Sequence, residues 1–342
     1  MTEKQWNDLQ RILKGEVLDP LPAGFIIDSP WLPNWAGMTI LDYFTSDPHW
    51  MDANLTAIRT FPDVMFLPGF WSEYGMCTEP SAFGARSNFP QDEFPHAHKV
   101  LRSAADIDDL PAPNPAKDGL LPFILNRLKL NRAKIEDAGH QIRFAVARGP
   151  LNIASYLMGS TEFLTVMMME PDKARQLVRK ITDFLKDWIA LQTDTFPTID
   201  GILLLDDIIG FIGEDQFKEF GLPYFKELYD VDVSVKFLHN DAPCEVSAPY
   251  LPEIGVNLFN MGFDPSLNDL KQATQNKVVM LGNIPPRDVL AAGTPDDIRK
   301  AAVELIHGLE DKSMVLFSCG GGMPPGASTE NLKAFVESVR NG

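Results

Sequence analysis

The chain has 342 residues, and 30 Lys and Arg against 47 Asp and Glu give it a formal net charge of −17. Hydrophobic residues make up 45% of the chain and charged residues 23%, values that allow a sizeable core and exclude a disordered or collagen-like protein. The acidic balance argues against nucleic acid as a partner, because phosphate binding needs a cationic surface. It also argues against polyanionic small molecules, unless a local arginine cluster overrides the net field.

Cysteine usage and the lack of long apolar runs bear on the cellular compartment. Cys77, Cys244 and Cys319 are odd in number, widely spaced, and form no Cys-x-x-Cys motif, which favours free thiols in a reducing environment. The first residues are charged and lack the apolar stretch of a signal peptide. No run of about 18 apolar residues is available to span a membrane. We therefore expect a cytoplasmic protein.

Short apolar runs that predict buried strands recur along the chain. Two less distinct candidates lie at residues 25–27 and 64–66, and residues 62–118 are irregular and rich in Pro, Gly and aromatic side chains. From about Gln141 onward the pattern is regular. Six runs of mainly apolar residues follow, at 143–150, 201–207, 233–241, 256–264, 278–286 and 314–322. Such runs are typical of strands buried on both faces.

Helices are predicted between these runs. An apolar stripe at three- and four-residue spacing follows Pro171, a second helix is capped at Thr294 and stops at Gly308, and a third carries an apolar face near the C-terminus. About eight strand–helix units in a chain of this length predict an α/β fold, a (β/α)8 TIM barrel forming one domain over residues 1–342 with an N-terminal extension. A doubly wound open sheet is the alternative, but no Gly-x-Gly-x-x-Gly follows an early strand.

Polar residues end the apolar runs, and in a barrel the ends of the strands carry the functional groups. Polar groups at these positions are costly to bury without partners or ligands. They are Arg148, Asp206, Asp207, His239, Asn240, Asp241, Asn260, Asp264, Asn283 and Cys319.

His239, Asp241 and Cys319 are the candidate metal ligands. His239 and Asp241 are two residues apart, so at an extended strand end both side chains point the same way, and closure of the barrel could bring Cys319 to the same mouth. Imidazole, carboxylate and thiolate are the ligands of zinc, and three protein ligands with an open fourth position define a catalytic site. The alternative is a hydrogen-bonded strand-end histidine and a small buried cysteine.

The sequence leaves open which further residues complete the metal site. Asp207, Glu219 and Cys244 are candidates, but the Asp206–Asp207 pair could instead cap the following segment. Glu219 could be a solvated helix residue, and Cys244 a loop thiol without a role.

From about Phe144 to the C-terminus the chain resembles the uroporphyrinogen decarboxylase superfamily, including its corrinoid-linked methyltransferase branch. The matching stretches are ILLLDDIIG, FLHNDAP, LPEIGVNLFN, VMLGNIPPRDVLAAGTPDDIRKAA and SCGGGMPPGASTENLKAFVES, and EYGMCTEPSAFGA at 73–85 is similar to a segment of the methyltransferase branch. The resemblance implies a single (β/α)8 barrel, and homodimers are common in the superfamily.

Two branches of this superfamily differ in their N-terminal region. Uroporphyrinogen decarboxylases carry an arginine-rich motif that grips the carboxylates of the tetrapyrrole, whereas this chain has no Arg or Lys between Lys14 and Arg59. Eight substrate carboxylates without an arginine clamp are electrostatically unfavourable. The resemblance therefore favours the methyltransferase branch.

The zinc motif of that branch is His-x-Cys followed much later by Cys, and it implies His239 and Cys319 as ligands, with Asp241 in the middle position. A carboxylate donates less charge than a thiolate, so the metal would stay more electrophilic and would suit polarisation of an ether oxygen. We therefore expect a zinc-dependent O-demethylase methyltransferase that moves a methyl group from a small donor, best a methoxylated aromatic, to the cob(I)amide of a separate corrinoid protein.

The expected site residues follow from this reading. Asp207, His239 and Asp241 are expected to be catalytic, and His239, Asp241, Cys319 and Glu219 to hold the metal. The expected substrate contacts are Arg148, Asn260, Asn283, Phe70, Trp71 and Tyr74, although core packing is the alternative for many of the aromatic residues. Other functions stay open: a uroporphyrinogen decarboxylase-like lyase, a methylcobamide:coenzyme M-type methyltransferase, or a non-catalytic barrel that binds a small molecule.

Overall fold

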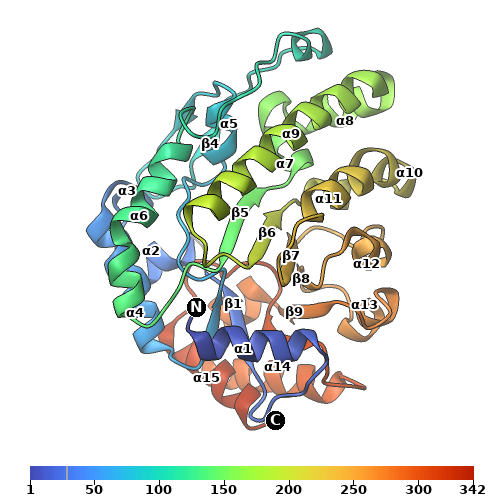
Figure 1. Cartoon of the computed structure of the whole chain (residues 1–342). Coiled ribbons are helices and arrows are strands. Elements are labelled where there is room, and N and C mark those ends of the chain that lie inside the picture. Colours follow the sequence, from blue (N-terminus) through green and yellow to red (C-terminus); the bar gives the residue numbers. More distant parts are fainter. Residues whose placement is uncertain (28–29) are drawn as a thin grey trace.

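Eight parallel strands form the centre of the fold (Figure 1). The computed structural model describes residues 1–27 and 30–342. The strands are β1 (Ala23–Ile26), β2 (Val64–Leu67), β5 (Phe144–Arg148), β6 (Gly201–Leu205), β7 (Val235–Asn240), β8 (Leu258–Met261), β9 (Val279–Ile284) and β10 (Val315–Cys319). They pair in the order β2-β1-β10-β9-β8-β7-β6-β5. Apart from β2 and β5, which end the sheet, central strands that follow one another in the chain are neighbours, and the first strand pairs with the last.

Pairing of the first strand with the last curls the sheet into a barrel, with the helices outside (Figure 1). The predicted (β/α)8 TIM-barrel class is therefore confirmed, and the doubly wound alternative is wrong. Among the described residues no ladder joins β2 to β5, so the sheet is open at this one place. The segment before α1 lies there: the backbone nitrogen of Met1 donates to the carbonyl oxygen of Gln141 at 2.9 Å, and Thr2 forms a bridge with His140.

The helices surround the strands, with α1 across the amino-terminal end. They are α1 (Glu3–Leu13), α2 (Trp31–Trp35), α3 (Ile40–Thr45), α4 (Asp47–Thr60), α5 (Thr78–Ala82), α6 (Leu121–Asp137), α7 (Pro150–Met158), α8 (Ser160–Met169), α9 (Pro171–Thr195), α10 (Glu214–Gln216), α11 (Leu222–Tyr229), α12 (Leu251–Ile254), α13 (Leu267–Ala273), α14 (Pro295–Gly308) and α15 (Thr329–Arg340). A small hairpin, β3 (Ser87–Asn88) and β4 (His96–Ala97), lies in the predicted irregular region. Within the described part of the chain, no helix is both long and apolar enough to cross a membrane.

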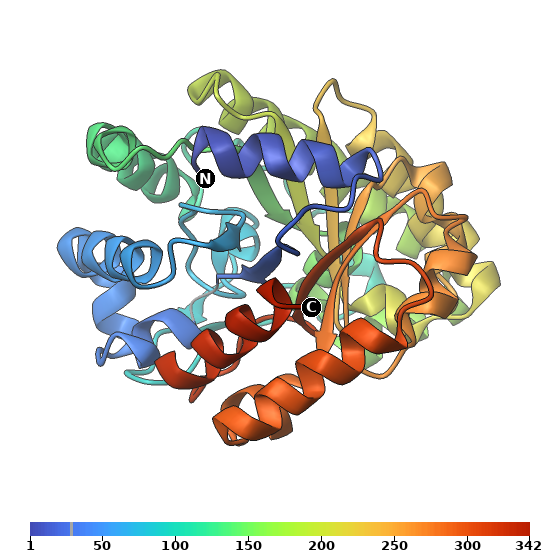
Figure 2. The ribbon, with the colours of Figure 1, turned by 90° about the horizontal axis from the view of Figure 1, so that it is seen from below.

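Alternation along the strands divides the apolar side chains into two clusters. One set faces the helices, and the other faces the barrel interior, where strand residues such as Phe144, Leu203 and Phe237 meet Trp6 and Leu9 of α1. Figure 2 shows α1 lying over the barrel at this end. The interior is therefore filled and closed at the amino-terminal end, which leaves the carboxyl ends of the strands for a site.

At the carboxyl end of the sheet, Asp206 fastens β6 to the start of α7. Its Oδ2 accepts hydrogen bonds from the backbone N–H groups of Leu151 and Asn152 at 2.9 and 3.2 Å. Asp206 is fully buried and serves as the N-terminal cap of α7, because Gly149, the residue before this helix, has no side chain. Asp206 is thus a capping residue, but the helix that it caps is α7, which precedes β6 in the chain, and not the following segment that the sequence suggested.

Gly149 allows this close approach, since a Cβ atom there would lie 2.3 Å from Oδ2 of Asp206. We expect Gly149→Ala to lower the free energy of unfolding by about 1–3 kcal/mol through overpacking. Gly308→Ala is the matched control, because a Cβ atom added to this glycine at the end of α14 would meet nothing within 4 Å; there alanine should be neutral or stabilising. Urea unfolding followed by circular dichroism measures both, and equal stabilities would contradict the prediction.

Candidate functional site

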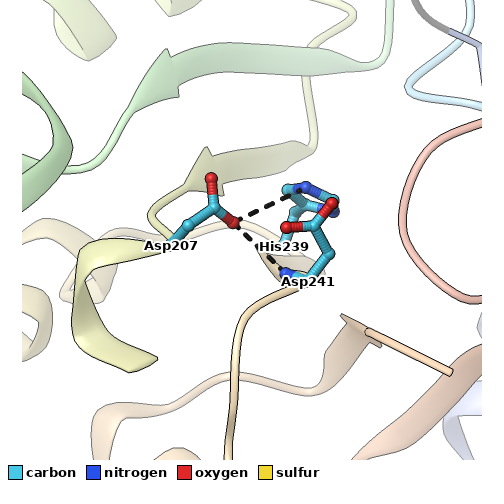
Figure 3. Close-up of side chains that lie close together, drawn as sticks. All are labelled: Asp207, His239 and Asp241. Carbon is cyan, nitrogen blue, oxygen red and sulfur yellow. Dashed lines mark hydrogen bonds and ion pairs between the residues drawn. The ribbon is translucent and has the colours of Figure 1, made fainter. Parts of the chain in front are cut away.

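Asp207, His239 and Asp241 converge at the carboxyl ends of β6 and β7 (Figure 3). One ligand atom from each residue lies within 4.8 Å of the other two. Oδ1 of Asp207 lies 3.9 Å from Nε2 of His239 and accepts a hydrogen bond from the backbone N–H of Asp241 at 3.2 Å. Asp207 comes two residues after β6, His239 is in β7, and Asp241 directly follows β7. The parallel order of two neighbouring strands therefore brings these groups together.

The imidazole of His239 is held in one orientation by Asn260 on the neighbouring strand β8. Nδ1 of His239 and Oδ1 of Asn260 are 2.7 Å apart, and Nδ2 of Asn260 donates to the carbonyl oxygen of Leu281 at 2.7 Å. Because the amide nitrogen already donates to this carbonyl, the amide oxygen accepts a hydrogen bond from the N–H group at Nδ1 of His239. The lone pair of His239 is then on Nε2, the nitrogen that faces Asp207.

Asp207 is positioned by Asn152, a buried residue in the first turn of α7. Oδ1 of Asn152 accepts hydrogen bonds from the backbone N–H groups of Asp207 and Ile208 at 3.0 and 3.1 Å. Its Nδ2 lies 3.4 Å from Oδ2 of Asp207. The helix that Asp206 caps thus also fixes the backbone and the carboxylate of the next residue.

Burial raises the pKa of Asp241, and the neighbouring carboxylate of Asp207 raises it further, while His239 opposes the shift. Gly321 lies directly against this side chain, since a Cβ there would be 3.0 Å from Oδ2 of Asp241. Taken as whole residues, Asp207 is half-buried and Asp241 is exposed, and two carboxylates this close together favour a cation between them. The donor set also fits zinc, which accepts imidazole nitrogen and carboxylate oxygen.

Beside this group, Arg148 at the end of β5 binds two buried glutamates. Its guanidinium lies 2.7 Å from Oε2 of Glu73 and 3.7 Å from Oε2 of Glu79, and its backbone N–H donates to Glu79. Strand register places Arg148, Leu205 and His239 side by side on successive strands. The predicted polar residue at this strand end is therefore part of the same mouth, but it is paired within the protein.

Sequence reasoning missed four residues of this mouth: Asn152, Tyr156, Glu73 and Glu79. The hydroxyl oxygen of Tyr156 lies 3.5 Å from Nδ2 of Asn152. Burial raises the pKa of Tyr156 strongly, which keeps the hydroxyl protonated. Asn152 and Tyr156 are four residues apart on α7, so they lie on one helix face. Their position right after a polar strand end was the signal available for these two residues, whereas Glu73 and Glu79 lie in the segment 73–85 that resembles the methyltransferase branch.

Cys319 ends β10 at the same edge but lies on the side of the helices. It is fully buried and belongs to the apolar cluster that faces the helix layer, together with Phe317 two residues earlier. Its thiol donates to the carbonyl oxygen of Gly321 at 3.8 Å. Cys319 is not part of the group formed by Asp207, His239 and Asp241, and its role as a ligand stays a prediction.

Glu219 lies away from the mouth. It is in the π-helical turn Phe217–Gly221, and its carboxylate, 43% exposed, pairs with Arg175 of α9. This position matches the alternative prediction, that Glu219 is a solvated helix residue, and gives no support to its prediction as a metal ligand. Cys244 is buried in the helix-facing cluster.

The remaining predicted substrate residues have partners of their own. Asn283 donates to the carbonyl oxygen of Pro265 at 2.8 Å, and Trp71 donates to that of Ile27 at 2.7 Å. Phe70 packs edge-on against Trp50. Tyr74 lines a separate groove of about 440 Å³ between α3 and α6.

The matching family model, "Uroporphyrinogen decarboxylase (URO-D)", covers residues 7–342. The chain therefore belongs to the uroporphyrinogen decarboxylase family, and the resemblance stated from the sequence is confirmed.

Curated relatives agree with this assignment, and a solved structure shares the fold. The chain is 26% identical to the uroporphyrinogen decarboxylase of Chloroherpeton thalassium over 275 residues, which are 76% of this chain and 75% of the relative. It is 24% identical to that of Dichelobacter nodosus over 97% of both chains. A methyltransferase from Methanosarcina mazei superimposes with a TM-score of 0.82 at 18% identity, covering 98% of both chains. At this identity the superposition shows a shared fold.

Asn152 tests the structural basis of the site without removing a candidate ligand. We expect Asn152→Ala to lower the free energy of unfolding by about 1–3 kcal/mol, because the buried N–H groups of Asp207 and Ile208 lose their acceptor. Asn126→Ala on the exposed face of α6 is the control and should change stability by less than about 0.5 kcal/mol. A loss no larger than the control's in urea unfolding would refute this role.

Proposed function

We propose that this protein is a zinc-dependent methyltransferase that moves a methyl group from a small methylated donor to the cob(I)amide of a partner corrinoid protein. The observation that carries the proposal is the convergence of Asp207, His239 and Asp241 at the carboxyl ends of the strands. A methoxylated aromatic is the donor we favour, and the cytoplasm is the expected location.

In this proposal some residues of the site would bind zinc and others would position the zinc ligands. Asp207, His239 and Asp241 would hold the zinc, with Cys319 as a candidate additional ligand, and Asn260 and Asn152 would keep the imidazole and Asp207 in place. When bound, zinc supplies Lewis acidity toward the heteroatom of the donor. In the overall reaction the bond between the methyl carbon and that heteroatom breaks, the methyl carbon bonds to cobalt, and the heteroatom keeps the electron pair and takes up a proton.

Porphyrin decarboxylation, which the names of the relatives suggest, is supported less well. A tetrapyrrole with many carboxylates needs several free cations, but the guanidinium of Arg148 is bound to Glu73 and Glu79. The N-terminal region offers no Arg or Lys between Lys14 and Arg59. Both observations favour a donor without a set of carboxylates.

Metal content is the first test. Elemental analysis of the chain after zinc loading and removal of excess metal should give about one zinc per chain. Asp207→Ala, His239→Ala and Asp241→Ala should each bring the content close to zero, since each removes a proposed ligand. Glu219→Ala is the matched carboxylate control and should retain zinc, because this side chain pairs with Arg175.

Two outcomes of this measurement change the assignment. Loss of zinc in Cys319→Ala would add the thiolate to the ligand set, whereas retention would leave the two aspartates and the histidine. A wild-type chain that takes up no zinc contradicts the proposal.

Turnover is the second test. With a dimethoxybenzene as donor, the zinc-loaded chain should consume cob(I)alamin, which is followed by its absorbance. His239→Ala should lower the rate by about 100-fold or more, as expected when a charge-stabilising group is lost. Activity that survives in His239→Ala without zinc would rule out the metal-dependent reaction.

A further inference from the structure

Besides the candidate metal ligands, the mouth of the barrel contains the guanidinium of Arg148, which is paired with two glutamates of the same protein. In the part of the chain that the structure describes, Arg148 is the only Lys or Arg among the residues that end the eight central strands. It is 6% exposed, and its partners Glu73 and Glu79 are 5% and 1% exposed. These groups are thus shielded from water. In such a buried environment an ion pair is strong and an unpaired charge is costly.

We infer that the pairing of Arg148 with Glu73 and Glu79 makes the site select methyl donors that carry no carboxylate. The inference rests on the proposed methyl transfer and adds the chemical class of the donor. A carboxylate on the donor would need a cation to replace its water, and the cation beside the cluster is already bonded to Glu73 at 2.7 Å.

Charge balance at the mouth supports the same selection. Asp207, Asp241, Glu73 and Glu79 bring four carboxylates, whereas Arg148 and a divalent metal together would bring three positive charges. A donor carboxylate would therefore enter a site with no excess positive charge, inside a protein with a net charge of −17. Its desolvation would have no compensating partner, so a neutral analogue of the same shape is favoured.

Glu73 is the residue whose removal should change the selection. It makes the shorter contact to Arg148, from the segment that follows β2. Glu73→Gln keeps the shape of the side chain and removes its charge. The guanidinium of Arg148 can then pair with the carboxylate of a bound donor. Glu79 also accepts the backbone N–H of Arg148, and its removal would therefore disturb the strand end as well.

The experiment compares 3,4-dimethoxybenzyl alcohol with 3,4-dimethoxybenzoate, which differ mainly in the carboxylate. With cob(I)alamin as acceptor, the wild-type chain should use the alcohol with a kcat/KM at least about tenfold higher, the order expected for one charge-assisted contact. In Glu73→Gln, the ratio of benzoate to alcohol kcat/KM should rise about tenfold. The double variant Glu73→Gln/Arg148→Gln should return the ratio to the wild-type value or below.

Three results would overturn the inference: wild-type preference for the benzoate or no preference, an unchanged ratio in Glu73→Gln, or a raised ratio that persists without Arg148. The wild-type comparison does not depend on the folding of any variant. If the wild-type chain transfers methyl groups from neither compound, the proposed reaction fails, and calorimetric binding of the same pair tests the selection separately. Tighter binding of the alcohol then supports selection against carboxylates, and equal binding, or binding of neither compound, refutes it.

Discussion

The mouth of this barrel depends on the junction between the start of α7 and the end of β6. Asp206 accepts two N–H groups of the helix, and Asn152 of the helix accepts two N–H groups of the segment that follows the strand. These reciprocal bonds satisfy backbone groups that would otherwise be buried without partners. They also determine where Asp207 lies, and hence whether it can meet His239 and Asp241.

A second constraint is the distribution of charge. The chain is acidic overall, and its mouth gathers carboxylates in two adjoining groups, one around His239 and one around Arg148. Among the residues that the structure describes, no Lys or Arg pairs with the first group, which therefore suits a metal ion, while the second group contains its own guanidinium. This arrangement differs from an arginine-lined pocket for a polycarboxylate, although the chain belongs to a family named for such a reaction. Function in this fold depends on the residues of the site rather than on the barrel.

The sequence allowed the barrel to be predicted because its last six strands are mainly apolar runs with polar residues at or near their carboxyl ends. The first two strands, β1 and β2, were less distinct in the sequence. Glu219 could not be placed from the sequence, because its partner Arg175 is 44 residues away in the chain. Glu73 and Glu79 were missed for the same reason, since they lie in an irregular segment and reach Arg148 across about 70 residues.

The sequence by itself determined the fold class, the family, and the strand ends at which polar groups would gather, because these follow from hydrophobic periodicity and from motifs contiguous in the chain. Only the tertiary structure decided which of these groups meet. His239 and Asp241 share one strand end, but Asp207 joins them through the pairing of β6 with β7. Cys319 follows the alternation of β10 toward the helices. Strand order and the facing of side chains across a curled sheet depend on contacts between residues far apart in the chain, and local patterns do not contain them.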